Sequence, residues 1–240
     1  MLIAPIFVQD SSSIDQSLNA LFDAERTVRS LHEDLAGQPE APLLAALTDA
    51  IAAALRESDD DEAALRLVRI SALLGEFDGP VVVDALIDIL GSNHIEARNH
   101  AGEQLEGLAF DRFKDVARGV ERALKRLPVG SPALSELPYI LAEIPEPGVV
   151  KLLGQFLRLA DADAVVAGIE ALVQVGDPSA ARLIQPLTSD ARTVELHEDG
   201  AEGSTELTIG ELAEEAIEIL SGDVDDIGDE EPPNGRGLPS

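Results

Sequence analysis

The sequence predicts an all-α protein built as an α-solenoid, with helix pairs stacked side by side and one small β-hairpin near the C-terminus. First, acidic breaks at Asp78, Asp111, Glu146 and Asp177 recur at steps of 33, 35 and 31 residues, each between two apolar runs. Second, apolar residues in these runs repeat every three or four positions, as on one face of a helix. Third, aromatic residues make up only 3%, so the core must consist of Leu, Ile, Val and Ala, which suits close-packed helices.

The breaks have the chemistry of joints between antiparallel helices. Asp78-Gly79-Pro80 and Asp177-Pro178 place a capping acid just before a proline at or near the first helical position. Pro138 lies within a helical run, so that helix should start late or be kinked. The predicted apolar faces are Leu67, Ile70, Leu73 and Leu74; Val82, Leu86, Ile89 and Leu90; Leu134, Leu137, Leu141 and Ile144; Val149, Leu152, Leu153, Phe156 and Leu157; and Val165, Ile169 and Leu172.

The region before the first joint reads as two further helices. Residues 12–35 form one long amphipathic pattern, whose apolar positions are Ile14, Leu18, Leu21, Phe22, Val28 and Leu31. A second helix runs from about Pro42 to Leu55, and the acidic cluster 58–62 caps the helix that follows. We therefore divide the chain into an N-terminal arm (1–11), capping helices (12–59), repeats (60–221) and a flexible acidic tail (222–240).

One segment within the repeats departs from the helical period. Residues 193–197 and 205–209 alternate apolar and polar side chains around the sequence EDGAEGS. This alternation predicts a β-hairpin at about 193–209, followed by a closing helix at 212–220.

The charge of the chain restricts its partners. It has 46 acidic and 17 basic residues, a net charge of −29, and the tail supplies only a small part of it. Such a surface repels duplex DNA and anionic membranes, so we expect neither as a partner. The acidity has two open explanations, a salt-adapted, Lys-poor surface or recognition of a basic partner. The chain has no Cys, no apolar run of about 18 residues and no signal-peptide pattern, so we expect a cytoplasmic protein.

Two stretches carry a family resemblance. GIEALVQVGDPSAARLIQPL (168–187), with Gly-Asp-Pro at its joint, and HIEARNHAGEQLEGLAF (94–110), with Arg98, resemble HEAT repeats of the short prokaryotic type that also occurs in phycobilin lyases. The resemblance covers roughly 60–220 and implies a right-handed superhelix with a concave binding surface. The unit around Leu134 departs from the pattern, because it contains Pro138 and its joint reads IPEP.

No catalytic, cofactor-binding or metal-binding site is predicted. Some HEAT-like hydroxylases bind iron through several His-Glu pairs, but here only His32-Glu33 and His197-Glu198 occur, one in the long first helix and one in the hairpin. His94 and His100 lack the spacing of a helical metal site. The acidic run 223–231 lacks a complete calcium loop. Phosphate-binding, dinucleotide-binding and nucleophile motifs are also missing.

Two sets of residues are candidates for binding a protein partner. By the HEAT resemblance the second helix of each pair, at about 62–76, 95–109, 134–144 and 163–175, lines the concave side. Its polar candidates are Arg66, Arg69, Arg98, Asn99, Glu103, Glu136 and Glu170. The second set is a basic strip of Arg112, Arg118, Arg122 and Arg126, with Lys114 and Lys125 nearby. It reads either as a solvated helix with internal ion pairs to Asp111 and Asp115, or as a docking strip for an acidic partner or the acidic tail.

These observations favour a non-enzymatic scaffold or adaptor that binds proteins, for example in prokaryotic taxis or signalling. One alternative is an inhibitory, immunity-type binder that covers a basic toxin or nuclease with its acidic surface. The other is a phycobilin-lyase-like enzyme, which the family resemblance alone implies.

Overall fold

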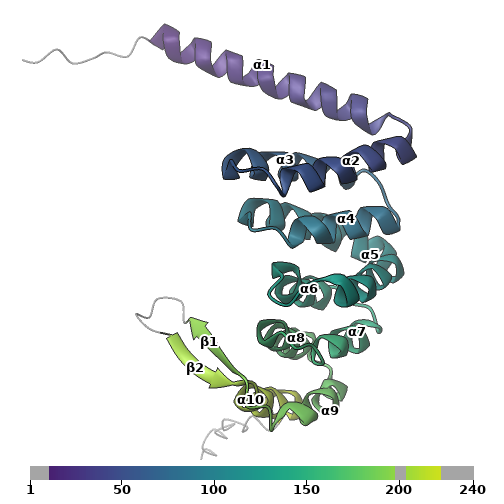
Figure 1. Ribbon diagram of the computed structural model, residues 1–240, viewed down its shortest axis with the longest axis vertical. Helices are drawn as coiled ribbons and strands as arrows, with labels where there is room; N and C mark the ends of the chain where they lie inside the picture. The colour runs from purple at the N-terminus through teal and green to yellow at the C-terminus, as the bar shows by residue number, and fades with distance from the viewer. Residues whose placement is uncertain (1–10, 198–203, 223–240) are drawn as a thin grey trace, which may run out of the picture. The chain divides into compact units, whose positions relative to one another are not determined.

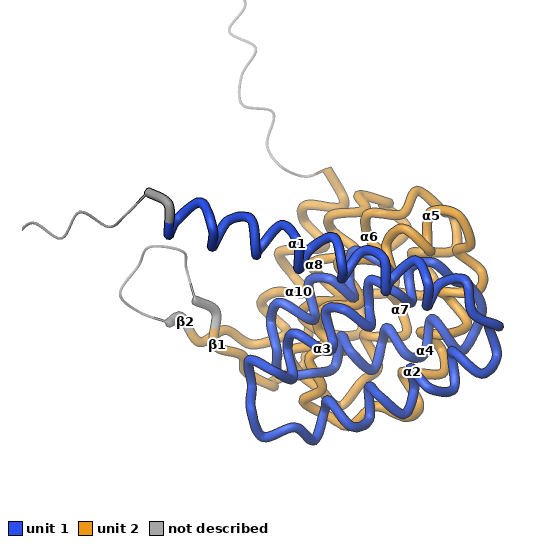
Figure 2. Tube along the Cα trace, turned by 90° about the horizontal axis from the view of Figure 1, so that it is seen from above, with its two compact units in different colours: residues 1–104 blue, residues 105–240 orange. Residues whose placement is uncertain are grey.

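The structure is a computed structural model that describes residues 11–197 and 204–222. The predicted N-terminal arm, the turn of the hairpin and the acidic tail lie outside these ranges, apart from Ser11 and Gly222 at their edges. The described residues are mostly helical, with ten α-helices and one two-stranded antiparallel sheet. They form two compact units, residues 1–104 and 105–240 (Figure 2). The sequence did not indicate this division, because the boundary falls inside a continuous helix.

Unit 1 contains four helices and the start of a fifth. These are α1 (Ser11–Ala36), α2 (Glu40–Ala54), α3 (Asp60–Leu74), α4 (Pro80–Leu90) and the first part of α5 (Ile95–Arg126). Helix α2 packs against α3 and α4. Fully buried leucines and isoleucines, among them Leu67, Leu74, Leu86 and Ile87, form the core. The long first helix and the second helix predicted from the sequence are both present, within two residues of their expected ends.

Unit 2 is built from helices in two rows. It contains the rest of α5, α6 (Pro132–Ala142), α7 (Val149–Phe156), α8 (Ala162–Val175), α9 (Ala181–Ile184), flanked by the short 3₁₀ turns η1 (Pro178–Ala180) and η2 (Gln185–Leu187), and α10 (Ile209–Ser221). Helix α8 packs against α6, α7 and α10, and α9 packs against α10. Figure 1 shows α6, α8 and α10 stacked on one side of this unit and α5, α7 and α9 on the other. We call α5 beyond Arg112, α7 and α9 the first row, and α6, α8 and α10 the second row.

All four predicted joints interrupt helices. Asp78, Glu146 and Asp177 lie between successive helices, and Asp111 precedes a break inside α5, where Arg112 has φ −140° and ψ 45°. The Asp177 carboxylate accepts a hydrogen bond from the Ser179 N–H (2.8 Å) and caps η1, as predicted.

Three local expectations were confirmed or corrected at helix starts. Asp59 caps α3 by accepting from the Glu62 N–H (3.2 Å), as the acidic cluster predicted. At α4 the capping position belongs to Gly79 and not to Asp78, and its φ of 102° favours glycine. For Pro138 we expected a late start or a kink; the late start was wrong, because α6 begins at Pro132 and continues through the buried Pro138, and the kink stays a prediction. Burial of this face outweighs the one backbone hydrogen bond that a proline removes.

The predicted apolar faces of the repeats are buried, and only Ile70 among them is partly exposed. The amphipathic face of α1 differs. Leu21 is 55% exposed and Phe22 is 51% exposed, so the apolar side of the N-terminal half of this helix is not covered by other described residues. Amphipathic spacing predicts that a helix has an apolar face, but not what lies against it.

The hairpin confirms its prediction. Strands β1 (Thr193–His197) and β2 (Ser204–Thr208) are antiparallel, with Thr193 opposite Thr208. Helix α10 follows β2 directly. Thr208 and Glu211 form a reciprocal capping box, in which the Thr208 hydroxyl accepts from the Glu211 N–H (3.1 Å) and Glu211 accepts from the Thr208 N–H (2.8 Å).

A charged clamp holds the base of the hairpin against the end of α7. The Arg192 guanidinium donates to the Asp190 carboxylate, at 2.6 Å for the shortest contact, and to the carbonyl oxygens of Leu159 (3.0 Å) and Ala160 (3.1 Å). The backbone carbonyls of Arg192 and Asp190 also accept hydrogen bonds from the start of α10. The Ile209 N–H donates to the Arg192 carbonyl, and the Gly210 N–H donates to the Asp190 carbonyl. The clamp therefore ties a strand and two helices together.

We expect Asp190→Asn to destabilise unit 2 at neutral pH but not in acid. Hydrogen bonds from Arg192 lower the pKa of Asp190. The carboxylate therefore contributes stability at pH values above its unfolded pKa of about 3.9, and this contribution disappears as the pH falls through the lower folded pKa. Urea unfolding at a series of pH values should show curves for the wild type and the variant that converge in acid. A difference that is independent of pH would contradict the assignment.

Candidate functional site

The basic residues of unit 2 are gathered on its first row. The described part of the unit contains ten Lys and Arg residues, and all but Arg192 lie on or directly beside first-row helices. We call these nine the basic row: Arg112, Lys114, Arg118, Arg122, Lys125, Arg126, Lys151, Arg158 and Arg182. The first-row helices carry two acids, Asp115 and Glu121, and three more, Asp111, Glu146 and Asp177, lie in the segments just before them. A locally positive surface thus occurs in a chain whose net charge is −29.

The apolar periodicity of each helix turns these cations outward. In α5, Val116, Val120 and Ala123 are buried, so the lysines and arginines between them lie on the remaining faces. In the short helix α7, Leu152, Leu153 and Phe156 are buried against the core, which leaves Lys151 exposed.

The basic row is only partly neutralised within the unit. Arg112 and Arg118 both form ion pairs with Asp115, at 2.9 and 3.7 Å, as the solvated-helix interpretation of the strip predicts. The side chains of Lys151, Arg158 and Arg182, in contrast, make no hydrogen bond or ion pair with any described residue. The α7–α9 part of the row is therefore the part whose cations are most available to a partner.

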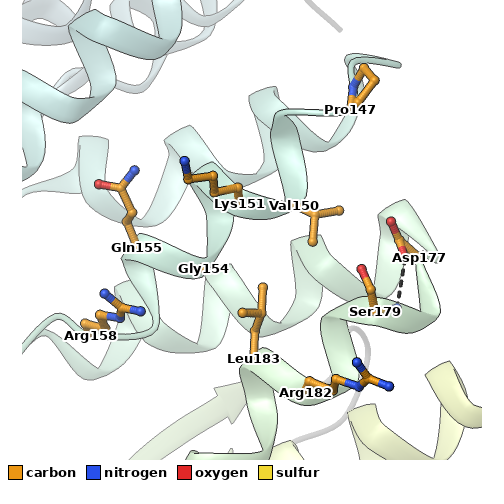
Figure 3. Close-up of a pocket in the computed structure, with 10 residues that line it drawn as sticks. All are labelled: Pro147, Val150, Lys151, Gly154, Gln155, Arg158, Asp177, Ser179, Arg182 and Leu183. Atoms are coloured by element: carbon orange, nitrogen blue, oxygen red, sulfur yellow. Dashed lines mark hydrogen bonds between the residues drawn. The ribbon is translucent and has the colours of Figure 1, made fainter.

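A hollow of about 620 Å³ lies on this row between α7 and α9. Figure 3 shows Lys151, Gln155 and Arg158 extending from the α7 side and Ser179 and Arg182 from the other side. Leu183 lies between the two sides, and the hollow also contains one carboxylate, that of Asp177, which accepts from the Ser179 N–H. The three cationic groups point in different directions rather than toward one centre. This arrangement suits an extended acidic segment better than a single small anion.

The second row has the opposite charge. Helices α6, α8 and α10 contain no Lys or Arg and carry seven acids: Glu136, Asp163, Glu170, Glu211, Glu214, Glu215 and Glu218. Side chains on neighbouring second-row segments are joined at the repeat step of 31 residues. The Tyr139 hydroxyl donates to Glu170, and the Gln174 amide donates to Glu143. Burial, followed by the hydrogen bond to Glu170, raises the pKa of Tyr139.

An apolar groove of about 310 Å³ runs between α8 and α10 on this row. Its apolar lining comprises Val166, Ile169, Val173, Leu212, Ala216 and Ile219. Glu170 and Glu215 also line it, and Ile219 is 46% exposed. The groove could bind an apolar side chain of a partner, and its two acids could pair with basic side chains on either side of that residue.

The predicted concave-face residues of unit 1 are mostly engaged in contacts within that unit. Arg66 pairs with Glu62 (2.7 Å) and Glu57 (3.4 Å), and Arg69 lies 3.9 Å from Glu25. Further along the chain, Arg98 donates to the Ser92 carbonyl oxygen (3.2 Å), Glu103 lies 3.8 Å from His100, and Asn99 is exposed. Glu136 and Glu170 belong to the second row of unit 2. The structure therefore does not assemble the seven candidates into one site within either unit.

Sequence reasoning found the α5 part of the basic row but missed Lys151, Arg158 and Arg182. Assigning each Lys and Arg to the first or second helix of its pair would have revealed the segregation. In the described parts of the chain, no group of three or more His, Asp or Glu side chains is placed to hold a metal ion. Within the same ranges, no helix has the length and apolar character required to cross a membrane.

Comparisons with known proteins give little further guidance. Neither a scan against protein-family models nor a search of curated proteins finds a match. Among solved structures, the chain is similar to two engineered proteins from the Northeast Structural Genomics Consortium. One is 19% identical, covers 82% of this chain and 90% of its own, and has a TM-score of 0.30. The other is 18% identical, with coverages of 83% and 92% and a TM-score of 0.35. Scores this low support no conclusion about function.

Proposed function

We propose that this protein is a non-enzymatic adaptor that binds an acidic segment of a partner protein along the basic row of unit 2. The observation that carries the proposal is the segregation of charge, with nine cations on or beside the first row and no Lys or Arg on the second-row helices. Random placement of scarce basic residues over an acidic surface would not separate them in this way. An α-solenoid of HEAT type is the architecture we propose for the whole chain, and the joints at steps of 31 to 35 residues support it.

The net charge and the basic row act over different distances. At physiological ionic strength the Debye length is about 8 Å, so a bound acidic segment interacts mainly with the row and little with acids elsewhere. At low salt the overall charge of −29 repels the same segment. Affinity for an acidic peptide should therefore rise from low to physiological salt and fall again in molar salt, a profile that simple ion pairing does not produce.

Replacing Arg182, whose side chain has no partner among the described residues, by Glu should weaken acidic-peptide binding about three- to tenfold, because an exposed ion pair of up to about 1 kcal/mol is lost and a like-charge contact is gained. The probe is a fluorescent peptide rich in Asp and Glu with interspersed Leu, and its anisotropy is followed with the full-length chain. Arg182→Glu tests the row, and Arg56→Glu in unit 1 is the control, because both side chains are exposed and both substitutions change the charge equally. Equal losses in the two variants, or no binding at any salt concentration, would refute the proposal.

A second candidate function rests on the second row. Its seven acids and the apolar groove between α8 and α10 favour a basic, amphipathic segment, as expected for an inhibitory binder of a basic protein. A peptide with Lys in place of the acids distinguishes the two functions. If this basic peptide binds in the α8–α10 groove, Ile219→Glu should weaken its binding. Stronger or unchanged binding by the variant would show that the peptide does not bind in the groove.

A further inference from the structure

The N-terminal half of α1 carries a row of large apolar side chains that no helix in the described part of the chain buries. Ile14, Leu18, Leu21 and Phe22 are 48%, 45%, 55% and 51% exposed. They follow the spacing of four and three residues that places side chains on one helix face. In the C-terminal half, Glu25 lies 3.9 Å from Arg69 of α3, and His32 lies 3.4 Å from Glu76 just beyond α3. Among the described residues of unit 1, the side-chain contacts of α1 with α3 thus involve its C-terminal half.

The C-terminal half of α1 and helix α3 enclose an apolar groove of about 620 Å³. Its apolar lining consists of Val28, Leu31, Leu35, Leu65, Ala72 and Leu73. Leu31 and Leu65 remain 56% and 53% exposed, so the groove is open to solvent. Glu25, Arg29, His32 and Arg69 also line it. Glu25 lies beside Arg69, whereas the Arg29 side chain makes no hydrogen bond or ion pair with any described residue.

We propose that two copies of this chain associate through α1 in antiparallel orientation, with the exposed N-terminal half of each α1 seated in the α1–α3 groove of the other copy. Each copy supplies one apolar helix segment and one apolar groove, so a two-fold axis satisfies both at once and closes the assembly. In this pairing, Leu18 of one copy packs opposite Val28 of the other, and the two Phe22 rings lie close to the axis.

Charge complementarity identifies the occupant as a second copy. Asp15 and Arg29 lie at equal sequence distances on either side of Phe22. A two-fold axis near Phe22 therefore places Asp15 of each copy beside Arg29 of the other, which forms two identical ion pairs. An unrelated partner would have to reproduce this sequence of apolar and acidic positions.

Salt affects this association in a way that the proposal specifies. The net charge of −29 on each copy opposes pairing at low ionic strength, and salt screens that repulsion. Burial of the leucines and of Phe22 does not weaken in salt and strengthens with sulfate. The dimer should therefore be tighter in molar salt than in dilute buffer.

Sedimentation of the full-length chain tests the assembly. We expect a dimer at micromolar concentration in molar salt. Leu18→Glu should weaken it by about a hundredfold or more, because each dimer loses two buried leucines. Gln16→Glu is the matched control: it adds the same charge on the opposite side of α1, where it should have little effect. Circular dichroism should show that both variants keep their helices. A wild-type chain that stays monomeric, or equal effects of the two variants, would overturn the proposal.

A charge exchange tests the antiparallel register independently. Asp15→Arg and Arg29→Asp should each weaken the dimer about tenfold in moderate salt, because each dimer loses two ion pairs and gains two like-charge contacts. The double variant restores opposite charges in exchanged positions and should recover most of the wild-type affinity. If the double variant is as weak as the product of the two single variants, the two side chains do not meet and this register is wrong.

Discussion

Phe156→Ala is expected to lower the free energy of unfolding of unit 2 by about 3–5 kcal/mol, the range for truncating a buried phenylalanine. Phe156 is fully buried on the inner side of α7. Opposite it, Gly168 lets the backbone of α8 approach so closely that a methyl group there would lie 3.1 Å from Phe156 Cβ. Two helices this close cannot collapse much further into the space left by the ring, so most of the cavity cost remains.

Urea unfolding followed by circular dichroism, with hydrogen exchange to localise the loss, measures this effect. The control is Phe110→Ala, which removes the same ring from a position that is 56% exposed, and we expect a change within about 0.5 kcal/mol. If the two alanine variants lose similar amounts, the contact between α7 and α8 does not carry the stability assigned to it.

Asp161→Ala is expected to cost about 2–4 kcal/mol, the sum of a lost helix cap and a lost charge-assisted hydrogen bond. Asp161 is only 6% exposed. One carboxylate oxygen caps α8 by accepting from the Ala164 N–H (3.2 Å), and the other accepts from the Gly130 N–H (2.6 Å) in the turn before α6. The side chain thus joins the starts of two second-row helices, whose backbone donors lack this acceptor in the variant.

Two further substitutions separate the roles of Asp161. Asp161→Asn keeps a capping oxygen but not the charge, so it should lose less stability than Asp161→Ala. Asp163→Ala removes an exposed acid from the first turn of the same helix and serves as the control. Amide exchange at Gly130 and Ala164 should accelerate in Asp161→Ala and stay slow in the control. Unchanged exchange at Gly130 would show that the link between the two helices is not significant.

Local patterns were sufficient to predict most of the secondary structure. Acids before prolines or between apolar runs located all four joints, and period-two alternation located the hairpin. These features depend on neighbouring residues, which a sequence displays directly.

Features that depend on distant residues were not predicted. The acceptor role of Asp161 involves a backbone N–H 31 residues earlier, and a backbone amide has no side-chain signature. The exposure of α1 has a similar origin, because its periodicity matches that of helices whose faces are buried. Part of the basic row was predicted, because its α5 residues form a cluster that is local in the sequence. Lys151, Arg158 and Arg182 were not predicted, because they join the row only through the stacking of helices that are distant in the sequence.

The separation of positive and negative side chains onto two rows gives unit 2 a permanent electric dipole moment directed across the rows. A charged molecule diffusing toward this unit experiences a torque before any atoms touch, so productive orientations are populated early in the encounter. Association rates at physiological ionic strength should then exceed those expected from the net charge alone, and they should depend on which face the approaching molecule meets first.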